Sequence, residues 1–161
     1  MEERYRREET AAERIDRNYA EQLQELRVVE TGVQILFAFL LGIAFQQRFT
    51  QTDGFQRAVF VVTLLASALS IAILVAPVAL HRFTFHAGRK DELVARTNTY
   101  AIAGLAALAL SICGAVLLVC DWVVNRPFAV AVTAVLALVL GALWFAVPHR
   151  RGRAIGDQLD R

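Results

Sequence analysis

Four long apolar runs constrain the fold of this chain more strongly than any other feature. They lie at about residues 28–45, 58–80, 99–120 and 128–147. Each run is near or above the ~17–25 apolar residues that an α-helix needs to cross a bilayer. Hydrophobic residues make up 57% of the chain and are concentrated in these runs. The sequence therefore predicts an all-α membrane protein with four transmembrane helices embedded in the lipid bilayer.

Residues 1–27 form a charged segment ahead of the first apolar run. Opposite charges recur four residues apart, as in Glu2–Arg6 and Glu13–Arg17, and a thin apolar stripe runs between them. Such spacing stabilises an exposed helix. We expect a charged amphipathic helix that leads into, or is continuous with, the first span. It would be a solvated helix, an oligomerisation stalk or a helix on the bilayer surface.

The distribution of lysine and arginine predicts the topology. Residues 1–27, the middle loop at 81–98 and the polar tail at 148–161 carry most of the basic side chains near the spans. The two opposite loops carry few, namely Arg48, Arg57 and Arg126. Basic residues mark the cytoplasmic side, so both termini are expected there, in a cell inner membrane. Trp122 and Trp144 lie near opposite ends of the last two spans, where interfacial aromatic residues are typical.

The first span is the only one that begins with a polar face. Arg27, Glu30, Thr31 and Gln34 fall on one side of a helix with 100° per residue. A carboxylate and an amide inside a membrane need a partner or water. Three interpretations compete: Glu30 pairs with Arg27 at headgroup depth, the face lines an aqueous path built by several copies, or it binds a partner protein.

The middle loop contains a basic and titratable cluster, made of His81, Arg82, His86, Arg89 and Lys90. Histidine titrates near neutral pH, so this cluster is a candidate pH sensor. The other interpretation is a loop that contacts lipid phosphates and fixes topology.

Small residues recur every four positions on the last two spans. The third span carries Ala103, Ala107 and Ser111, and the fourth carries Ala129, Thr133, Ala137 and Gly141. Membrane helices associate through such small stripes. Because only a short connection, 121–127, joins these spans, we expect them to pack closely against each other.

Several function classes lack support in the sequence. Nucleophile-elbow, zinc-protease, P-loop and dinucleotide motifs are missing, so we expect neither an enzyme nor a cofactor. Cys113 and Cys120 have no metal-ligand spacing, and no metal is expected. A net charge of +2 gives no basic excess for nucleic acid. Coupled antiporters need ionisable groups near the bilayer midplane, and the interiors of the last three spans carry none.

The chain resembles a family of small actinobacterial membrane proteins that is catalogued as a domain of unknown function. The residues that carry the resemblance are Leu23 to Leu41, Arg48-Phe49, Gln56-Arg57 and the Ala76 to Arg82 segment. The resemblance covers about Leu23 to Asn98 well and the last two spans only in hydropathy. It implies a bacterial inner-membrane protein, and some members are labelled sodium:proton antiporters.

Three functional hypotheses follow from these observations. The first is a homo-oligomer that supports ion or small-solute passage along the polar face of the first span. The alternative is a non-conducting scaffold or accessory subunit that binds a protein partner through residues 1–27. The third is a lipid- or pH-responsive sensor that uses the loop from His81 to Lys90.

Overall fold

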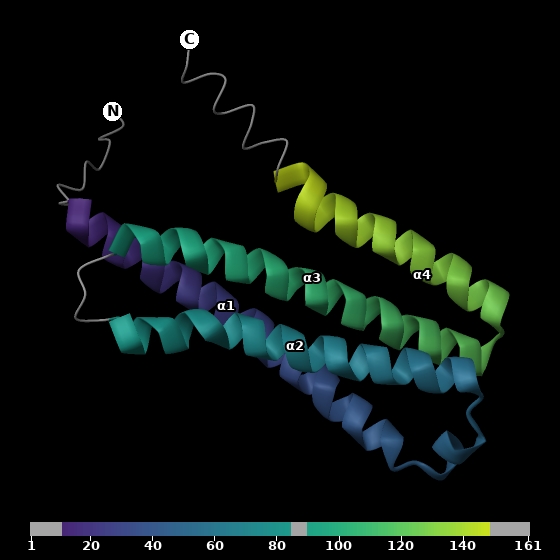
Figure 1. The fold of residues 1–161 in the computed structure, drawn as a ribbon. Helices are drawn as coiled ribbons and strands as arrows, with labels where there is room; N and C mark the ends of the chain where they lie inside the picture. The colour runs from purple at the N-terminus through teal and green to yellow at the C-terminus, as the bar shows by residue number, and fades with distance from the viewer. Residues whose placement is uncertain (1–10, 85–89, 149–161) are drawn as a thin grey trace, which may run out of the picture.

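The computed structural model describes residues 11–84 and 90–148, and all regular structure in them is helical. Figure 1 shows long helices running side by side, with short connections at their ends. The elements are α1 (Ala11–Ala44), the 3₁₀ turn η1 (Gln47–Gln51), α2 (Gly54–Thr84), α3 (Lys90–Val123), α4 (Arg126–Gly141) and the π-helical turn η2 (Ala142–Ala146).

Four of these helices are long and apolar enough to cross a membrane. The apolar segments are Leu23–Ala44, Gly54–Ala79, Asn98–Val123 and Arg126–Ala146. The prediction of an all-α protein with four candidate spans is therefore confirmed. Helix α1 runs without a break from the charged segment into its apolar part.

Three helices are longer than their apolar segments. At about 1.5 Å per residue, the 34 residues of α1 extend over ~51 Å, whereas the hydrocarbon core is about 30 Å thick. The start of α1, the end of α2 and the start of α3 lie at the same end of the bundle (Figure 1). The parts of these helices that extend beyond the apolar segments thus lie at one end of the bundle. This is the arrangement expected when consecutive spans are antiparallel.

Small and hydroxyl-bearing residues form the interface between α2 and α3. Ser70 Oγ donates to the Gly104 carbonyl at 2.8 Å, and Ser111 Oγ donates to the Thr63 carbonyl at 3.3 Å. A Cβ atom added at Gly114 would lie 2.0 Å from Thr63 Oγ1. The two backbones approach closely because these positions carry almost no side-chain volume.

Helix α1 packs on this pair through an apolar stripe. Leu26, Val33 and Leu40 are buried and seven residues apart, so they lie on one side of the helix. Leu26 and Val33 join one cluster with Leu74 of α2 and Leu108 of α3. Leu40 joins a second cluster with Phe60 and Leu118, near the η1 end of the bundle.

The helix ends differ from the boundaries expected from the sequence. The expected middle loop, 81–98, is shorter, because α2 continues to Thr84 and α3 begins at Lys90. Pro77 lies inside α2 without ending it. Pro148 is still helical, and the tail that follows it lies outside the described residues.

Candidate functional site

The polar face of α1 is a strip of four side chains, Arg27, Glu30, Thr31 and Gln34, called here the α1 strip. Thr31 Oγ1 donates to the Arg27 carbonyl at 2.9 Å. Gln34 Nε2 donates to Glu30 Oε1 at 3.1 Å. Both hydrogen bonds join residues of the same helix. The strip is therefore satisfied locally, by bonds that run along α1 rather than across to a neighbouring helix.

The α1 strip lies on the outside of the bundle. Arg27, Thr31 and Gln34 are exposed, and Glu30 is half-buried. Beyond the strip, toward the end of the helix, the exposed residues Leu41 and Phe45 are apolar. This face of α1 is thus polar over about two turns of the helix and apolar beyond them.

The pairing of Glu30 differs from the sequence-based expectation. An ion pair with Arg27 was one of the interpretations, yet the carboxylate of Glu30 accepts from Gln34 instead. At i,i+4 the two side chains lie one turn apart on the same face, which suits this bond. Arg27 is exposed on the surface of the helix.

A second polar site lies at the opposite end of the bundle and was not predicted. The Arg126 guanidinium contacts Asp53 Oδ2 and lies 3.4 Å from Asp121 Oδ1. Gln56 Nε2 donates to Asp121 Oδ2 at 2.8 Å. The Arg126 side chain also lies over the Phe55 ring, 4.3 Å from its centroid. We call this site, which joins the starts of α2 and α4 to the end of α3, the Arg126 clasp.

Local capping motifs position the Arg126 clasp. Asp53 and Gln56 form a reciprocal capping box at the start of α2, with bonds of 2.8 and 3.2 Å between each backbone N–H and the other side chain. Asn125 caps α4 by accepting from the Phe128 N–H at 3.0 Å. The backbone N–H of Gln56 and the guanidinium of Arg126 hold the pKa of Asp53 below its ordinary value.

Asp121 is the residue of the clasp that the sequence analysis placed wrongly. It was assigned to the connection 121–127, but it lies in the last turn of α3, with a side chain only 5% exposed. The spacing Asp53-x-x-Gln56 was a sequence signal for the start of α2. Nothing in the sequence linked Asp53 to Arg126, which lies 73 positions further along the chain.

The basic middle loop falls largely outside the described residues. His81 and Arg82 belong to the last turns of α2, and Lys90 is the first residue of α3. His86 and Arg89 lie outside the described ranges. The interpretation of this cluster as a sensor or a lipid-contacting loop stays a prediction.

The small residues of α3 and α4 do not form one continuous contact. Ser111 is buried against α2, to which it donates its hydrogen bond, and Ala103 is exposed, whereas Ala107 is half-buried. On α4, Ala129 is fully buried and the Thr133 hydroxyl is buried without a hydrogen-bond partner. Ala137 is exposed, and an added Cβ at Gly141 would meet nothing within 4 Å. Close packing of α4 is therefore limited to its first half.

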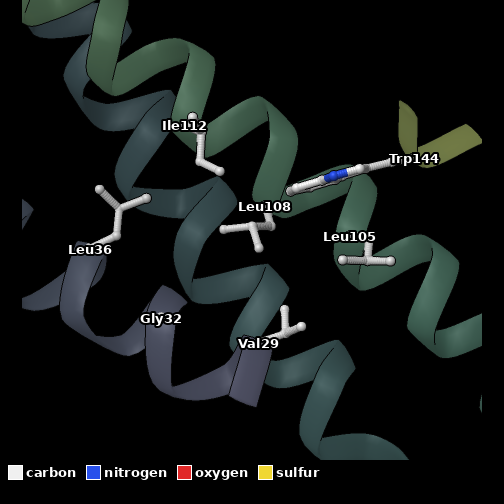
Figure 2. A pocket seen from close by; sticks show the side chains of 7 residues that line it. All are labelled: Val29, Gly32, Leu36, Leu105, Leu108, Ile112 and Trp144. Atoms are coloured by element: carbon white, nitrogen blue, oxygen red, sulfur yellow. The ribbon is translucent and has the colours of Figure 1, made fainter. Parts of the chain in front are cut away.

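An apolar groove of about 450 Å³ lies between α1 and α3. Figure 2 shows the indole of Trp144 reaching into it from the η2 turn. The lining residues are Val29, Gly32 and Leu36 of α1, Leu105, Leu108 and Ile112 of α3, and Trp144. Trp144 was expected at the membrane interface, but it packs against the buried cluster of Leu26, Val33, Leu74 and Leu108.

The comparisons with known proteins identify a family and no activity. A model of a family of unknown function, DUF6328, matches residues 8–148, which is most of the chain. Among curated proteins and among solved structures, none matches the chain. The expected resemblance to an uncharacterised family is confirmed, while the actinobacterial origin and the antiporter label remain implications of that resemblance. The four-helix chain with its outward-facing α1 strip belongs to the DUF6328 family of unknown function.

Proposed function

We propose that this protein is a self-associating membrane subunit, whose copies meet along the α1 strip. The observation that carries the proposal is the exposure of Thr31 and Gln34 within Leu23–Ala44, the apolar segment of α1. Polar side chains within a span are costly when they face hydrocarbon. The single bond from Gln34 to Glu30 leaves amide donor and acceptor capacity for a second helix. Hydrogen bonds between membrane helices stabilise association by about 0.6–2 kcal/mol each.

The test is the oligomeric state of the full chain in nanodiscs or mild detergent. The double variant Glu30→Leu/Gln34→Leu removes both polar groups of the strip and is expected to shift the protein toward monomers. The matched control is Ile35→Ala/Phe39→Ala, because these exposed apolar side chains lie on another side of the same helix. A wild-type protein that is monomeric, or a double variant that assembles like wild type, would contradict the proposal.

Ion or small-solute passage is a second candidate function of the same assembly. The observation that favours it is the carboxylate of Glu30, which would be repeated around a shared axis when several strips meet. Rings of carboxylates favour cations. In this case proteoliposomes should show cation flux above empty liposomes, and Glu30→Gln should reduce the preference for cations. An assembled protein without flux would leave the non-conducting subunit as the function.

The charged start of α1 supports a proposal about topology and partners. Arg17 and Glu21 form an ion pair at 3.1 Å along the helix, as expected for an extension that projects into water. We place this extension, the α2–α3 connection and the tail in the cytoplasm, where residues 1–27 would be available to a protein partner.

The topology is tested by impermeant thiol labelling of whole cells, in a background that lacks both native cysteines. Ala20→Cys and Thr50→Cys replace exposed residues on the two sides of the first span. Only Thr50→Cys should be modified from outside the cell, and labelling of Ala20→Cys instead would invert the topology. Deletion of residues 1–22 should release any co-purifying partner and leave the spans folded.

A further inference from the structure

Helix α4 has the smallest buried share of the four candidate spans. It packs mainly against α3, whereas α2 and α3 share the most extensive interface of the bundle. Its first half contacts α3 through the fully buried Ala129. Its second half diverges from α3 in Figure 1. There Ala137 is exposed and a Cβ added at Gly141 would meet nothing within 4 Å, although Leu136 and Leu140 are half-buried. The first half of α4 contains a fully buried residue and is called docked, whereas the second half contains none and is called open.

The side chain of Trp144 contacts the bundle at the far end of the open half. The η2 turn follows α4 directly, and its Val147 N–H donates to the Ala142 carbonyl, five residues earlier. From this turn the Trp144 indole enters the groove between Val29 of α1 and Leu105 and Leu108 of α3 (Figure 2). Trp144 is the residue through which this end of the chain joins the buried cluster built by the other three helices.

The π-helical turn makes the position of Trp144 adjustable. A π turn contains one residue more than an α turn, and π turns in long helices are commonly found at functional sites. Conversion of η2 to regular α-helix would rotate the following side chains by about 100°, the angle per residue of an α-helix. Trp144 lies in the middle of η2, so a change in the hydrogen-bond pattern of this turn would shift its indole relative to the groove without unfolding the helix.

The other end of α4 has the properties of a pivot. Arg126 contacts Asp53 of the α2 start and Asp121 of the α3 end, and it stacks on Phe55. Asn125 caps the first turn of α4. These contacts hold the start of α4, whereas the described residues beyond Thr133 include no buried one.

We propose that Trp144 is a releasable latch that holds the far half of α4 against the bundle, and that α4 swings about the Arg126 clasp when the indole leaves the groove. Release would further expose Val29 and Leu36, which are half-buried on the side of α1 opposite the α1 strip. The proposal concerns a movement within one chain and does not depend on self-association.

The test is a pair of spin-label distances measured in nanodiscs on the full chain, in a Cys113→Ala/Cys120→Ala background. One pair, Leu110→Cys with Leu138→Cys, spans α3 and the open half of α4, and all three native side chains of the two pairs are exposed. The other pair, Leu110→Cys with Val130→Cys, reports on the docked half. Trp144→Ala is expected to lengthen or broaden only the first distance, and Trp144→Phe should restore it in part.

Leu143→Ala is the matched control, since this neighbouring side chain is 59% exposed and lies outside the groove. It should leave both distances unchanged. A first distance that is the same in Trp144→Ala and wild type would overturn the latch. A second distance that changes as much as the first would also overturn it, because Trp144 would then stabilise the whole bundle rather than one end of α4.

Discussion

The α2–α3 interface and the α1 strip contain similar residues and use them in opposite ways. Ser70 and Ser111 donate hydrogen bonds to the backbone of the neighbouring helix, and both are fully buried. Thr31 and Gln34 bond only within α1 and are exposed. A polar group that is satisfied across two helices fixes their packing, whereas one that is satisfied within its own helix leaves that face open.

The difference predicts where the chain tolerates change. At the α2–α3 interface the serine hydroxyls form hydrogen bonds between the helices, and Gly114 leaves no room for a Cβ atom. On the α1 strip the side chains bond only within their own helix, so we expect them to contribute little to the fold of the chain. Substitutions that distinguish these two roles test the comparison directly, and the largest effect is expected from a change in volume.

Gly114→Ala should cause the largest loss of stability. The added Cβ would lie 2.0 Å from Thr63 Oγ1, whose hydroxyl already donates to the Val59 carbonyl at 2.6 Å. Overpacking of this kind costs about 1–3 kcal/mol. The control is Gly42→Ala on α1, where an added Cβ meets nothing within 4 Å. The measurement is the free energy of unfolding in mixed micelles, followed by circular dichroism, and equal stability of the two variants would contradict the close approach of α2 and α3.

Ser70→Ala should lower the free energy of unfolding by about 0.6–1.7 kcal/mol, the range measured for hydrogen bonds between membrane helices. The lost bond joins Ser70 Oγ to the Gly104 carbonyl at 2.8 Å. Thr31→Ala is the matched control, because it removes a hydroxyl that bonds only to its own helix at 2.9 Å. It should change the same free energy much less. Equal losses in both variants would mean that the direction of the bond does not matter.

The contribution of the Asp53 carboxylate to stability should be complete above its ordinary pKa of 3.8 and should be lost at lower pH. The folded state holds the pKa of Asp53 below its ordinary value of 3.8, so the carboxylate contributes stability above that value and loses it as the pH falls through the lowered pKa. Wild type and Asp53→Asn should therefore differ by a constant amount between about pH 7 and about pH 5 and converge at lower pH. The contribution is small because Arg126 and Asp53 are 45% and 51% exposed. A difference that disappears near neutral pH would assign the titration to another group.

The length and composition of the chain were sufficient to predict the four helices. Their apolar runs are local features, and a chain in lipid has to satisfy its backbone within each span. The position of the α1 strip was also predictable, because residues three and four apart share a face of any helix. The Gln34–Glu30 bond follows from that same spacing.

The partners of the helices could not be predicted in the same way. Ala103, Ala107 and Ser111 of α3 were expected to face α4, but Ser111 donates its hydrogen bond to α2 and Ala103 is exposed. A stripe on one helix does not tell which neighbour it meets, because alanine, glycine and serine are spread around α3. The Arg126 clasp joins residues that are far apart in sequence, and the π turn at Trp144 has no sequence signal in this chain.

Gln34→Leu should have the smallest effect on the fold of the single chain. Its amide is exposed and bonds only to Glu30, one turn away. Surface substitutions of this kind change stability by no more than about 0.5 kcal/mol. The free energy of unfolding should be measured at a high ratio of detergent to protein, where the chain is monomeric. It should then be compared with that of Ser70→Ala. At high protein density in the bilayer the same variant should assemble less than wild type.

The two measurements on Gln34→Leu separate a role in folding from a role in association. If the monomer loses as much stability as Ser70→Ala, the α1 strip supports the fold of its own chain and the comparison with the α2–α3 interface fails. If the monomer is unchanged and assembly is also unchanged, the amide is a polar group at headgroup depth that water satisfies. Only loss of assembly with an intact monomer agrees with a strip whose remaining hydrogen-bonding capacity is used by a second copy of the chain.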